Sequence, residues 1–382
     1  MNKDRFSPNP LVSIVKLDNY APANVMVSTE SLLEPLGGIK RFISLDGETM
    51  LKPNLLRPAV PDEAVTPHPE IIRAVARQAA SAGCGVVVLS DSPALASLDR
   101  CIKKLGMGGD EPFTVVDPGE PVETSYPGGR FQKVKISRRM LEADSIINIA
   151  KAKTHTQLGF TLAVKNMFGA VTGLEKARWH FRAGAADGRM FARLLVEVCE
   201  AVSPRLSILD AVVGMEGNGP GSGDPRPLGI LMASESPYAL DAVFCRVLGL
   251  DRKKMLTVSV AEEMGLVPKD ENIDIAGPDP ELFRPDPPWR WSGRTGQSVF
   301  PPSLAAVFRR LFGARPVIAK NICTGCGQCT RICPAEAIIV DEKKKKATLA
   351  KSRCISCFCC QEVCPEGAIT SSSGILIRLF GG

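Results

Sequence analysis

Two nearly identical cysteine phrases near the end of the sequence constrain the fold of this chain more than any other feature. The first reads CTGCGQCTRICP and starts at Cys323, and the second reads CISCFCCQEVCP and starts at Cys354. Each phrase has three cysteines separated by two residues, then a fourth after three more residues, and then a proline. Regularly spaced cysteines of this kind are typical metal ligands, so this part of the chain is expected to fold around metal.

The spacing C-x2-C-x2-C-x3-C-P is typical of bacterial two-cluster ferredoxins, in which the fourth cysteine of each phrase ligates the other cluster. It therefore predicts two 4Fe-4S clusters as cofactors. One is expected on Cys323, Cys326, Cys329 and Cys364. The other is expected on Cys354, Cys357, Cys360 and Cys333. Zinc is the alternative, but zinc sites use cysteine pairs about a dozen or more residues apart, and these triplets fit that pattern poorly.

Cysteine usage also indicates the compartment. The chain has 13 cysteines, and its first twenty residues contain no apolar run of signal-peptide length. Because a reducing compartment disfavours disulfides, we expect metal ligands and a cytoplasmic location. Cys359 lies outside the two-residue spacing and is not expected to be a ligand. The remaining cysteines are expected to pack as small apolar residues: Cys84, Cys101, Cys199 and Cys245.

Charge and hydropathy exclude some partners. The net charge is only +6, and no basic helix carries interleaved aromatic residues, so nucleic acid is not an expected partner. No run of about 18 apolar residues predicts a membrane span. The partners that we expect are a redox protein or a small anionic substrate. The run KKKK at Lys343 to Lys346 is interpreted as a solvated hairpin tip, with a docking patch as the alternative.

Residues 11 to 276 alternate strand-like and helix-like runs, which predicts an α/β domain with a mostly parallel sheet and helices on both faces. A small α+β ferredoxin-like domain is expected to follow. Strands are expected at LVSIVKL, ETMLKPNLL, GVVVLSDSP, SIINIAKAKTH, RLSILDAVVG and LGILMAS. Helices are expected at about 23–36, 69–83, 158–171, 189–201 and 238–248. In TPHPE, Thr66 is the expected N-cap and Pro67 the first helical residue.

Polar side chains gather where these strands end, and ligands of open α/β sheets bind at that edge. We predict an anion site with His155 as proton donor beside Lys153 and Lys165. Six further residues are expected to contact the ligand or line its rim: Lys52, Asn54, Lys151, Asn166, Glu216 and Asn218. The alternative is that these lysines are separate surface charges on unrelated loops. The glycine-rich GNGPGSGDP does not follow the first strand, so no dinucleotide-binding fingerprint is expected.

Several of these runs together resemble a known family. KPNLL, TPHPE, DSP, NIAKAKTHTQLGFTLAVKNMFGAVTG, WHFRAG and DAVVGMEGNGPGSGDP followed by ALDAV are similar to the domain of unknown function 362 family, over about residues 10 to 275. Members of this family often carry a two-cluster ferredoxin tail. The resemblance implies an iron-sulfur protein of anaerobic-type metabolism and no settled reaction.

The sequence thus predicts an α/β domain at 10–276, a proline-rich linker with a short helix at 277–314, and a two-cluster domain at 315–371. Trp289 and Trp291 are expected to pin the linker to the body of the protein. Two functions remain open. One is a reductase whose clusters pass electrons to a substrate or cofactor at the strand ends, and the other is an electron-transfer or metallocofactor-maturation protein that docks a partner.

Overall fold

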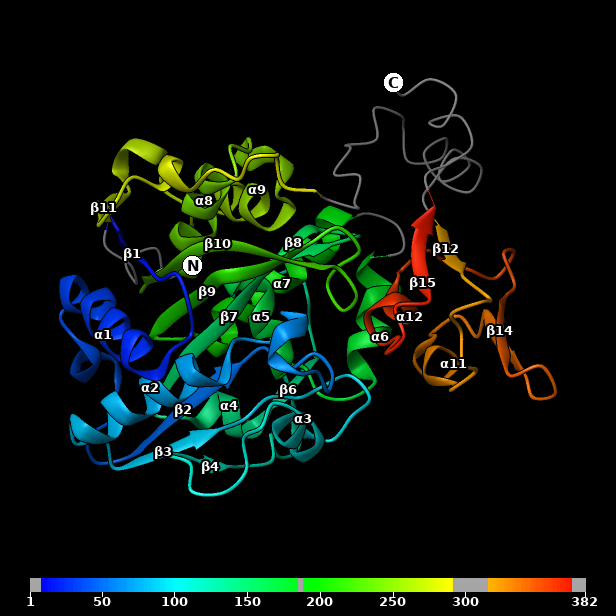
Figure 1. Ribbon diagram of the computed structural model, residues 1–382, viewed down its shortest axis with the longest axis horizontal. Coiled ribbons are helices and arrows are strands. Elements are labelled where there is room, and N and C mark those ends of the chain that lie inside the picture. The colour runs from blue at the N-terminus through cyan, green and yellow to red at the C-terminus, as the bar shows by residue number, and fades with distance from the viewer. Residues whose placement is uncertain (1–7, 185–187, 291–314, 373–382) are drawn as a thin grey trace.

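A nine-stranded, mostly parallel sheet forms the centre of the larger part of the molecule (Figure 1). The structure is a computed structural model, and it describes residues 8–184, 188–290 and 315–372. The strand order is β11-β1-β10-β9-β7-β2-β3-β4, and β8 pairs with β7. The strands are β1 (Leu11–Lys16), β2 (Glu48–Pro53), β3 (Val86–Leu89), β4 (Thr114–Val115), β7 (Ser145–His155), β8 (Gly159–Thr161), β9 (Leu206–Glu216), β10 (Asp224–Ser234) and β11 (Asp274–Ala276). Only β10 and β8 pair antiparallel with their neighbours, which confirms the expected sheet type.

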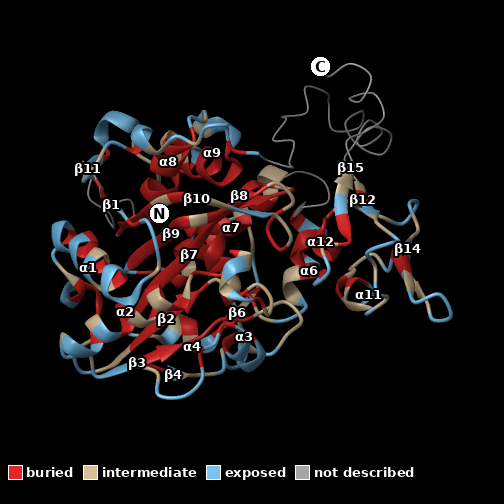
Figure 2. Ribbon diagram, viewed as in Figure 1, coloured by how far each residue is buried: buried red, intermediate tan, exposed pale blue. Residues whose placement is uncertain are grey.

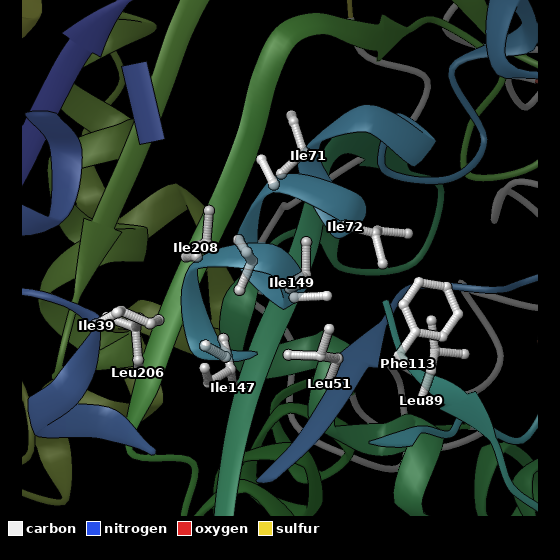
Figure 3. Close-up of a cluster of buried hydrophobic side chains, with 14 of the residues drawn as sticks. Ile39, Leu51, Ile71, Ile72, Leu89, Phe113, Ile147, Ile149, Leu206 and Ile208 are labelled. Carbon is white, nitrogen blue, oxygen red and sulfur yellow. The ribbon is translucent and has the colours of Figure 1, made fainter. Parts of the chain in front are cut away.

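Helices cover both faces of this sheet, because the central strands are apolar on both sides. In β7, for example, Ile147 and Ile149 join the core beneath α1 and α2 (Figure 3), while Ile146 and Ala150 join the cores on the opposite face. The burial pattern in Figure 2 follows the same layers. The helices are α1 (Pro22–Leu33), α2 (Pro69–Ser81), α3 (Leu98–Lys104), α4 (Arg138–Glu142), α5 (Ala163–Asn166), α6 (Glu175–Trp179), α7 (Gly188–Val202), α8 (Pro237–Val247) and α9 (Leu256–Glu263).

Shorter elements complete this part. A small hairpin is formed by β5 (Pro121–Thr124) and β6 (Val134–Ser137). Short 3-10 helices lie at Glu34–Leu36, Ile39–Phe42, Pro61–Glu63, Met167–Ala170, Arg252–Lys254, Asp270–Asn272 and Pro280–Phe283, and a π-helical turn at His180–Gly184. No helix in the described ranges is long and apolar enough to cross a membrane.

The start of α2 differs from the prediction. His68, not Thr66, is the N-cap, and its ring Nδ1 accepts a hydrogen bond from the Glu70 amide at 3.3 Å. Pro69 is the first helical residue. In TPHPE a proline follows both Thr66 and His68, so the helix could begin after either residue. The carboxylate of Asp210 accepts the His68 amide at 2.9 Å and so favours His68 as the N-cap.

The helix expected at 158–171 is also wrong in part. Gly159 has φ +87°, and β8 turns back to pair with the last three residues of β7. Helix α5 then starts only at Ala163, where the buried Asp241 accepts the amides of Ala163 and Val164. This reversal keeps Lys165 and Asn166 near the end of β7.

The described part of the chain ends in a small module built on two short antiparallel ribbons. One pairs β12 (Arg315–Ile318) with β15 (Ile369–Ser372), and the other pairs β13 (Ile338–Asp341) with β14 (Lys346–Leu349). Two short helices, α11 (Gln328–Ile332) and α12 (Cys359–Glu362), follow the paired cysteine loops. The residues at 342–345 form an exposed turn, which confirms the expected hairpin tip.

Part of the expected linker can be compared with the structure. Trp289 is 5% exposed and packs against Gly214 of β9, where a Cβ atom would lie 2.6 Å from the indole. It therefore fixes the start of the linker to the α/β domain, as expected. Trp291 and the short helix expected near 303–313 lie outside the described residues.

Candidate functional site

Eight cysteines line two separate cavities in the C-terminal module. The first cysteine cavity is lined by Cys323, Cys326, Cys329 and Cys364. The second cysteine cavity is lined by Cys333, Cys354, Cys357 and Cys360. Within the described ranges, no three Cys, His, Asp or Glu side chains are grouped closely enough to hold a single metal ion. Each cavity is nevertheless lined by one of the two sets of four that the sequence assigned, and four thiols around a larger space fit the donor set of a 4Fe-4S cluster.

The backbone around both cavities repeats as the sequence does. Gly325 and Gly327 of the first phrase have φ of +70° and +75°, and their counterparts Ser356 and Phe358 have φ of 56° and 60°. Backbone amides reach the sulfurs in both phrases: Ala347 donates to Cys323 Sγ at 3.4 Å, Ala337 to Cys333 Sγ at 3.2 Å, and Ser356 to Cys354 Sγ at 3.4 Å. Amides that point at sulfur favour the reduced form of an iron-sulfur cluster.

Cys359 lines neither cavity. Its side chain is buried in a small apolar cluster with Cys357, Val363 and Ala177, at the contact between α12 and α6. This position agrees with the packing role that we expect for Cys359.

Four of the predicted site residues form one chain of hydrogen bonds, which we call the lysine network: Lys52, Asn54, Lys153 and Asn166. Asn166 Oδ1 accepts from Lys52 Nζ at 3.3 Å and from Asn54 Nδ2 at 2.9 Å. Lys153 Nζ donates to Asn54 Oδ1 at 2.5 Å. Lys52 also forms a buried ion pair with Asp91 at 2.8 Å. The strand ends of β2 and β7 and the end of α5 therefore meet, as expected for strand ends in an α/β sheet.

Lys151 does not belong to this network. Its ammonium is paired with Asp210 at 2.8 Å and also donates to the Tyr20 hydroxyl at 3.1 Å. Tyr20 donates in turn to Asp210 and stacks on the ring of His68. The sequence prediction placed Lys151 in one site with the other lysines, but its carboxylate partner on the neighbouring strand β9 holds it in a separate cluster.

Lys165 is the exceptional lysine. It is 9% exposed, and its ammonium makes no hydrogen bond within the described part of the chain. Burial lowers the pKa of Lys165, and the nearby carboxylate of Glu362 opposes this effect. Burial and the charge of Lys165 likewise hold the pKa of Lys153 well below its usual range. Two buried lysines thus lie close together with one carboxylate, that of Glu362, nearby.

His155 has a different environment from the one expected. Its Nδ1 accepts the backbone amides of Gln157 and Leu158, so the ring proton is on Nε2, which faces Glu362 Oε1 at 2.9 Å. Burial, with the charge of Lys165, lowers the pKa of His155 to about 4. His155 is therefore neutral at pH 7 and donates its one proton to Glu362. The structure gives it a docking role and does not place it as a charged proton donor.

Glu362 and its neighbour Gln361 join the C-terminal module to the α/β domain, and both are buried. Gln361 Oε1 accepts from the Thr156 hydroxyl at 2.8 Å, and its amide nitrogen donates to Asn218. Although burial acts to raise it, the charge of Lys165 and the hydrogen bond from His155 hold the pKa of Glu362 below its usual range. Sequence reasoning missed both residues, because nothing in their spacing distinguishes them from surface positions of a short helix.

Two further predicted rim residues have other partners. Asn218 contacts α12 through Gln361 and donates to the Ile369 carbonyl at 3.3 Å, so it lies at the contact between the modules. Glu216 accepts two hydrogen bonds from Arg290, at 2.8 and 3.0 Å. It therefore anchors the start of the linker and does not line the lysine network. Lys176 of α6, which we did not predict, donates to the Ser92 carbonyl next to Asp91.

Comparison with known proteins agrees with this architecture. Residues 49–246 match the family described as domain of unknown function (DUF362), and residues 322–368 match a 4Fe-4S dicluster domain. A thylakoid-associated protein of Synechocystis sp. is 37% identical over 264 residues, which is 67% of this chain and 80% of that protein.

Two solved structures share weaker similarity. A protein from Thermotoga maritima matches at 13% identity with a TM-score of 0.36, over 56% of this chain. The lactate racemase apoprotein from Thermoanaerobacterium thermosaccharolyticum matches at 12% identity with a TM-score of 0.37, over 61% of this chain. The chain spans 55% of the length of each of these two proteins.

Proposed function

We propose, since the chain belongs to the domain of unknown function 362 family and also carries a 4Fe-4S dicluster domain, that it is a reductase that acts at the strand ends of its α/β domain. Bound 4Fe-4S clusters would supply single electrons. The acceptor would be a small anionic substrate or cofactor held near Lys165 and Lys153. The iron-sulfur electron-transfer character comes from the dicluster domain, and the reductase reaction is our inference.

One observation carries this proposal: helix α12, which bears Cys360, is buried against the end of β7. Glu362 and Gln361 of this helix bond to His155 and Thr156 at 2.9 and 2.8 Å. A carrier that only shuttled electrons between proteins would have no need to bury a cluster-bearing helix in a second domain. The contact instead brings Glu362 of this cysteine-bearing helix close to Lys165 and Lys153.

The charges at this contact favour an anion. Lys165 has no hydrogen-bond partner in the described residues, and Lys153 bonds only to neutral oxygens, those of Asn54 and the Val65 carbonyl. A bound carboxylate or phosphate group would stabilise the charged forms of these two buried lysines, because the carboxylate of Glu362 near them is already bonded to His155. In this role Lys165 contacts the ligand directly and Lys153 supports it.

An electron-transfer or maturation protein that docks a partner is the second candidate. It is favoured by the internal pairing of Lys52 with Asp91 and of Lys151 with Asp210, since neither of these lysines needs a ligand. For either function we propose a reducing compartment such as the cytoplasm, because the described cysteines form no disulfides and eight of them would be ligands.

The two candidates differ in what the purified protein holds. Anaerobically purified protein should contain roughly eight iron and eight sulfide per chain, as two 4Fe-4S clusters require. Mass spectrometry of the small molecules released on denaturation should also reveal an anionic compound in the wild type. Its amount should fall at least about tenfold in Lys165→Met, a loss of about 1.4 kcal/mol of binding or more.

A matched control is Lys254→Met, which removes an exposed lysine near α9. It should leave both the iron content and the bound compound unchanged. If iron is complete but the wild type releases no compound and Lys165→Met changes nothing, the docking protein becomes the better description.

A further inference from the structure

The two cysteine phrases are a matched pair in sequence, yet they differ in exposure. Cys326 in the first phrase is exposed, whereas its counterpart Cys357 is buried. The difference arises because Cys357 packs in an apolar cluster with Ala177 and the side chains of Ala94 and Leu95, all from the α/β domain. The second cysteine cavity is therefore the inner one, and the first cysteine cavity faces outward.

The basic hairpin tip lies against this outward cavity. Lys346 Nζ donates to the Cys323 carbonyl at 2.6 Å. Gly325, which lines the cavity, approaches the backbone of Lys345 so closely that a Cβ atom would lie 2.5 Å from its carbonyl oxygen. Lys343, Lys344 and Lys345 are exposed. The tip is thus fixed to the loop that holds Cys323 and Cys326, and it presents its charges beside them.

The surroundings of the tip suit a protein interface. Ile322, the residue before Cys323, is a large apolar side chain that is 47% exposed. Residues 341–346 carry four lysines and two carboxylates, and one of those lysines is held by the Cys323 carbonyl. An exposed apolar residue bordered by positive charge is the pattern expected for a surface that steers and then binds an acidic protein.

We propose that Ile322, Cys326 and the lysines at 343–345 form the docking surface for an acidic electron-carrier protein. Each docking event oxidises the donor by one electron and reduces the group in the first cysteine cavity by one, and no bond is formed or broken. The inference rests on the proposed presence of clusters in both cavities. It does not depend on the identity of the acceptor at the lysine network.

The test compares the wild type with the double variant Lys343→Glu and Lys344→Glu, which leaves the close backbone contact of Lys345 intact. The matched control is Lys253→Glu and Lys254→Glu, an exposed pair between α8 and α9 with the same change in charge (Figure 1). An acidic bacterial two-cluster ferredoxin, reduced, serves as the donor. Two quantities are measured anaerobically at low and high salt: the affinity of the complex by calorimetry, and the rate of cluster reduction by stopped flow.

At low salt we expect the tip variant to bind the donor at least about tenfold more weakly than the wild type, and to be reduced by it at least about tenfold more slowly. Both differences should shrink at high salt. The Lys253/Lys254 variant should stay within about twofold of the wild type. Reduction by methyl viologen radical, a cation, should not be slower in the tip variant. That result, together with unchanged iron content, would show that the clusters are intact.

Three outcomes would overturn the proposal. The tip variant could bind and be reduced as fast as the wild type. Both double variants could be slowed equally, which would reflect net charge alone. Finally, the tip could bind phosphatidylglycerol vesicles while its reversal leaves the reduction rate unchanged, which would assign this surface to an anionic membrane.

Discussion

At the scale of single residues, the buried lysines divide into those with and without an internal partner. Lys52 and Lys151 each form an ion pair of 2.8 Å with a buried aspartate. Lys165 is also buried, at 9% exposed, and bonds to nothing in the described ranges. A buried charge without a partner is costly, so it persists only where it has a purpose. This contrast is the reason we propose that Lys165 contacts a ligand.

The contrast predicts that the same substitution destabilises the fold strongly at Lys52 and weakly at Lys165. Lys52→Met should destabilise the fold by about 3–5 kcal/mol, because it leaves the carboxylate of Asp91 buried without its counter-charge. Lys165→Met should cost less than about 1 kcal/mol, since it replaces an unpaired charge by an apolar chain of similar length. Urea unfolding of both variants measures the difference. Equal destabilisation would mean that Lys165 has a structural partner that we have not identified.

Cys359 and Cys360 are adjacent, but they should differ in effect. Cys360→Ala should lose one cluster, because Cys360 lines the second cysteine cavity, whereas Cys359→Ala should keep the full iron content. Iron and sulfide analysis of anaerobically purified variants makes the comparison. Loss of iron in Cys359→Ala alone would show that the ligand register is shifted by one residue.

His180 should make stability sensitive to acid. Burial lowers the pKa of His180 to about 3, whereas an unfolded histidine titrates near 6.5. The unfolded state therefore binds the proton first, and stability is lost as the pH falls below about 6.5. From pH 7 to pH 5 this group should cost about 2 kcal/mol. His180→Phe should reduce that slope in urea titrations at pH 7, 6 and 5, and an unchanged slope would contradict the assignment.

At the scale of elements, the two cysteine loops have the same backbone conformation but different residues at the left-handed positions. The first loop uses glycine at both left-handed positions, and the second uses Ser356 and Phe358. Non-glycine residues in this conformation are strained by roughly 1 kcal/mol or more. The second loop tolerates the strain because its neighbours in the α/β domain hold it in place.

This repeat predicts how substitutions at equivalent positions will behave. Gly325→Ala should lose the cluster of the first cavity, because a Cβ atom at φ +70° would lie 2.5 Å from the Lys345 backbone. Ser356→Gly relaxes the same conformation in the second loop and should keep both clusters, with stability changed by less than about 1 kcal/mol. The broad absorbance near 400 nm, expected of cysteine-ligated clusters, reports both results. Full iron in Gly325→Ala would show that the loop can move away from Lys345.

At the scale of the whole molecule, the C-terminal module contacts the α/β domain through α12 (Figure 1), and Ile332 at the end of α11 joins the same buried cluster as Ala177. The second cysteine cavity therefore lies toward the α/β domain, and the first faces outward. An outer cavity with an exposed cysteine and an inner cavity against the α/β domain suit the relay that we propose, which would accept electrons at one end and deliver them at the other.

Unequal burial predicts that iron is lost in two phases. A ferrous chelator added after mild oxidation should remove roughly four of eight irons quickly, because Cys326 of the outer cavity is exposed. The other four should leave slowly. In Cys326→Ala the fast phase should disappear from the trace while the slow phase remains. A single phase in the wild type would mean that both cavities are equally accessible.

The local sequence was sufficient to predict the cysteine sets, the sheet type and part of the site. The cysteine spacing alone grouped the eight ligand candidates into the two sets that line separate cavities, because ligand spacing is set by the geometry of the metal centre. The alternation of strand-like and helix-like runs predicted the mostly parallel sheet. Parallel strands need crossover connections, and the helices in these connections bury both faces of the sheet. Polar residues after the strands indicated where Lys52, Asn54, Lys153 and Asn166 would meet.

Only the tertiary structure decided which of these groups are partners. Asp210, on the strand next to that of Lys151, pairs with Lys151 and so holds it outside the lysine network. Arg290 of the linker pairs with Glu216 in the same way. Helix α12 supplies Glu362 to His155 across 207 residues of chain. Spacing in sequence carries no information about such pairs, because their energy depends on burial and on which charges the fold brings within a few ångströms of one another.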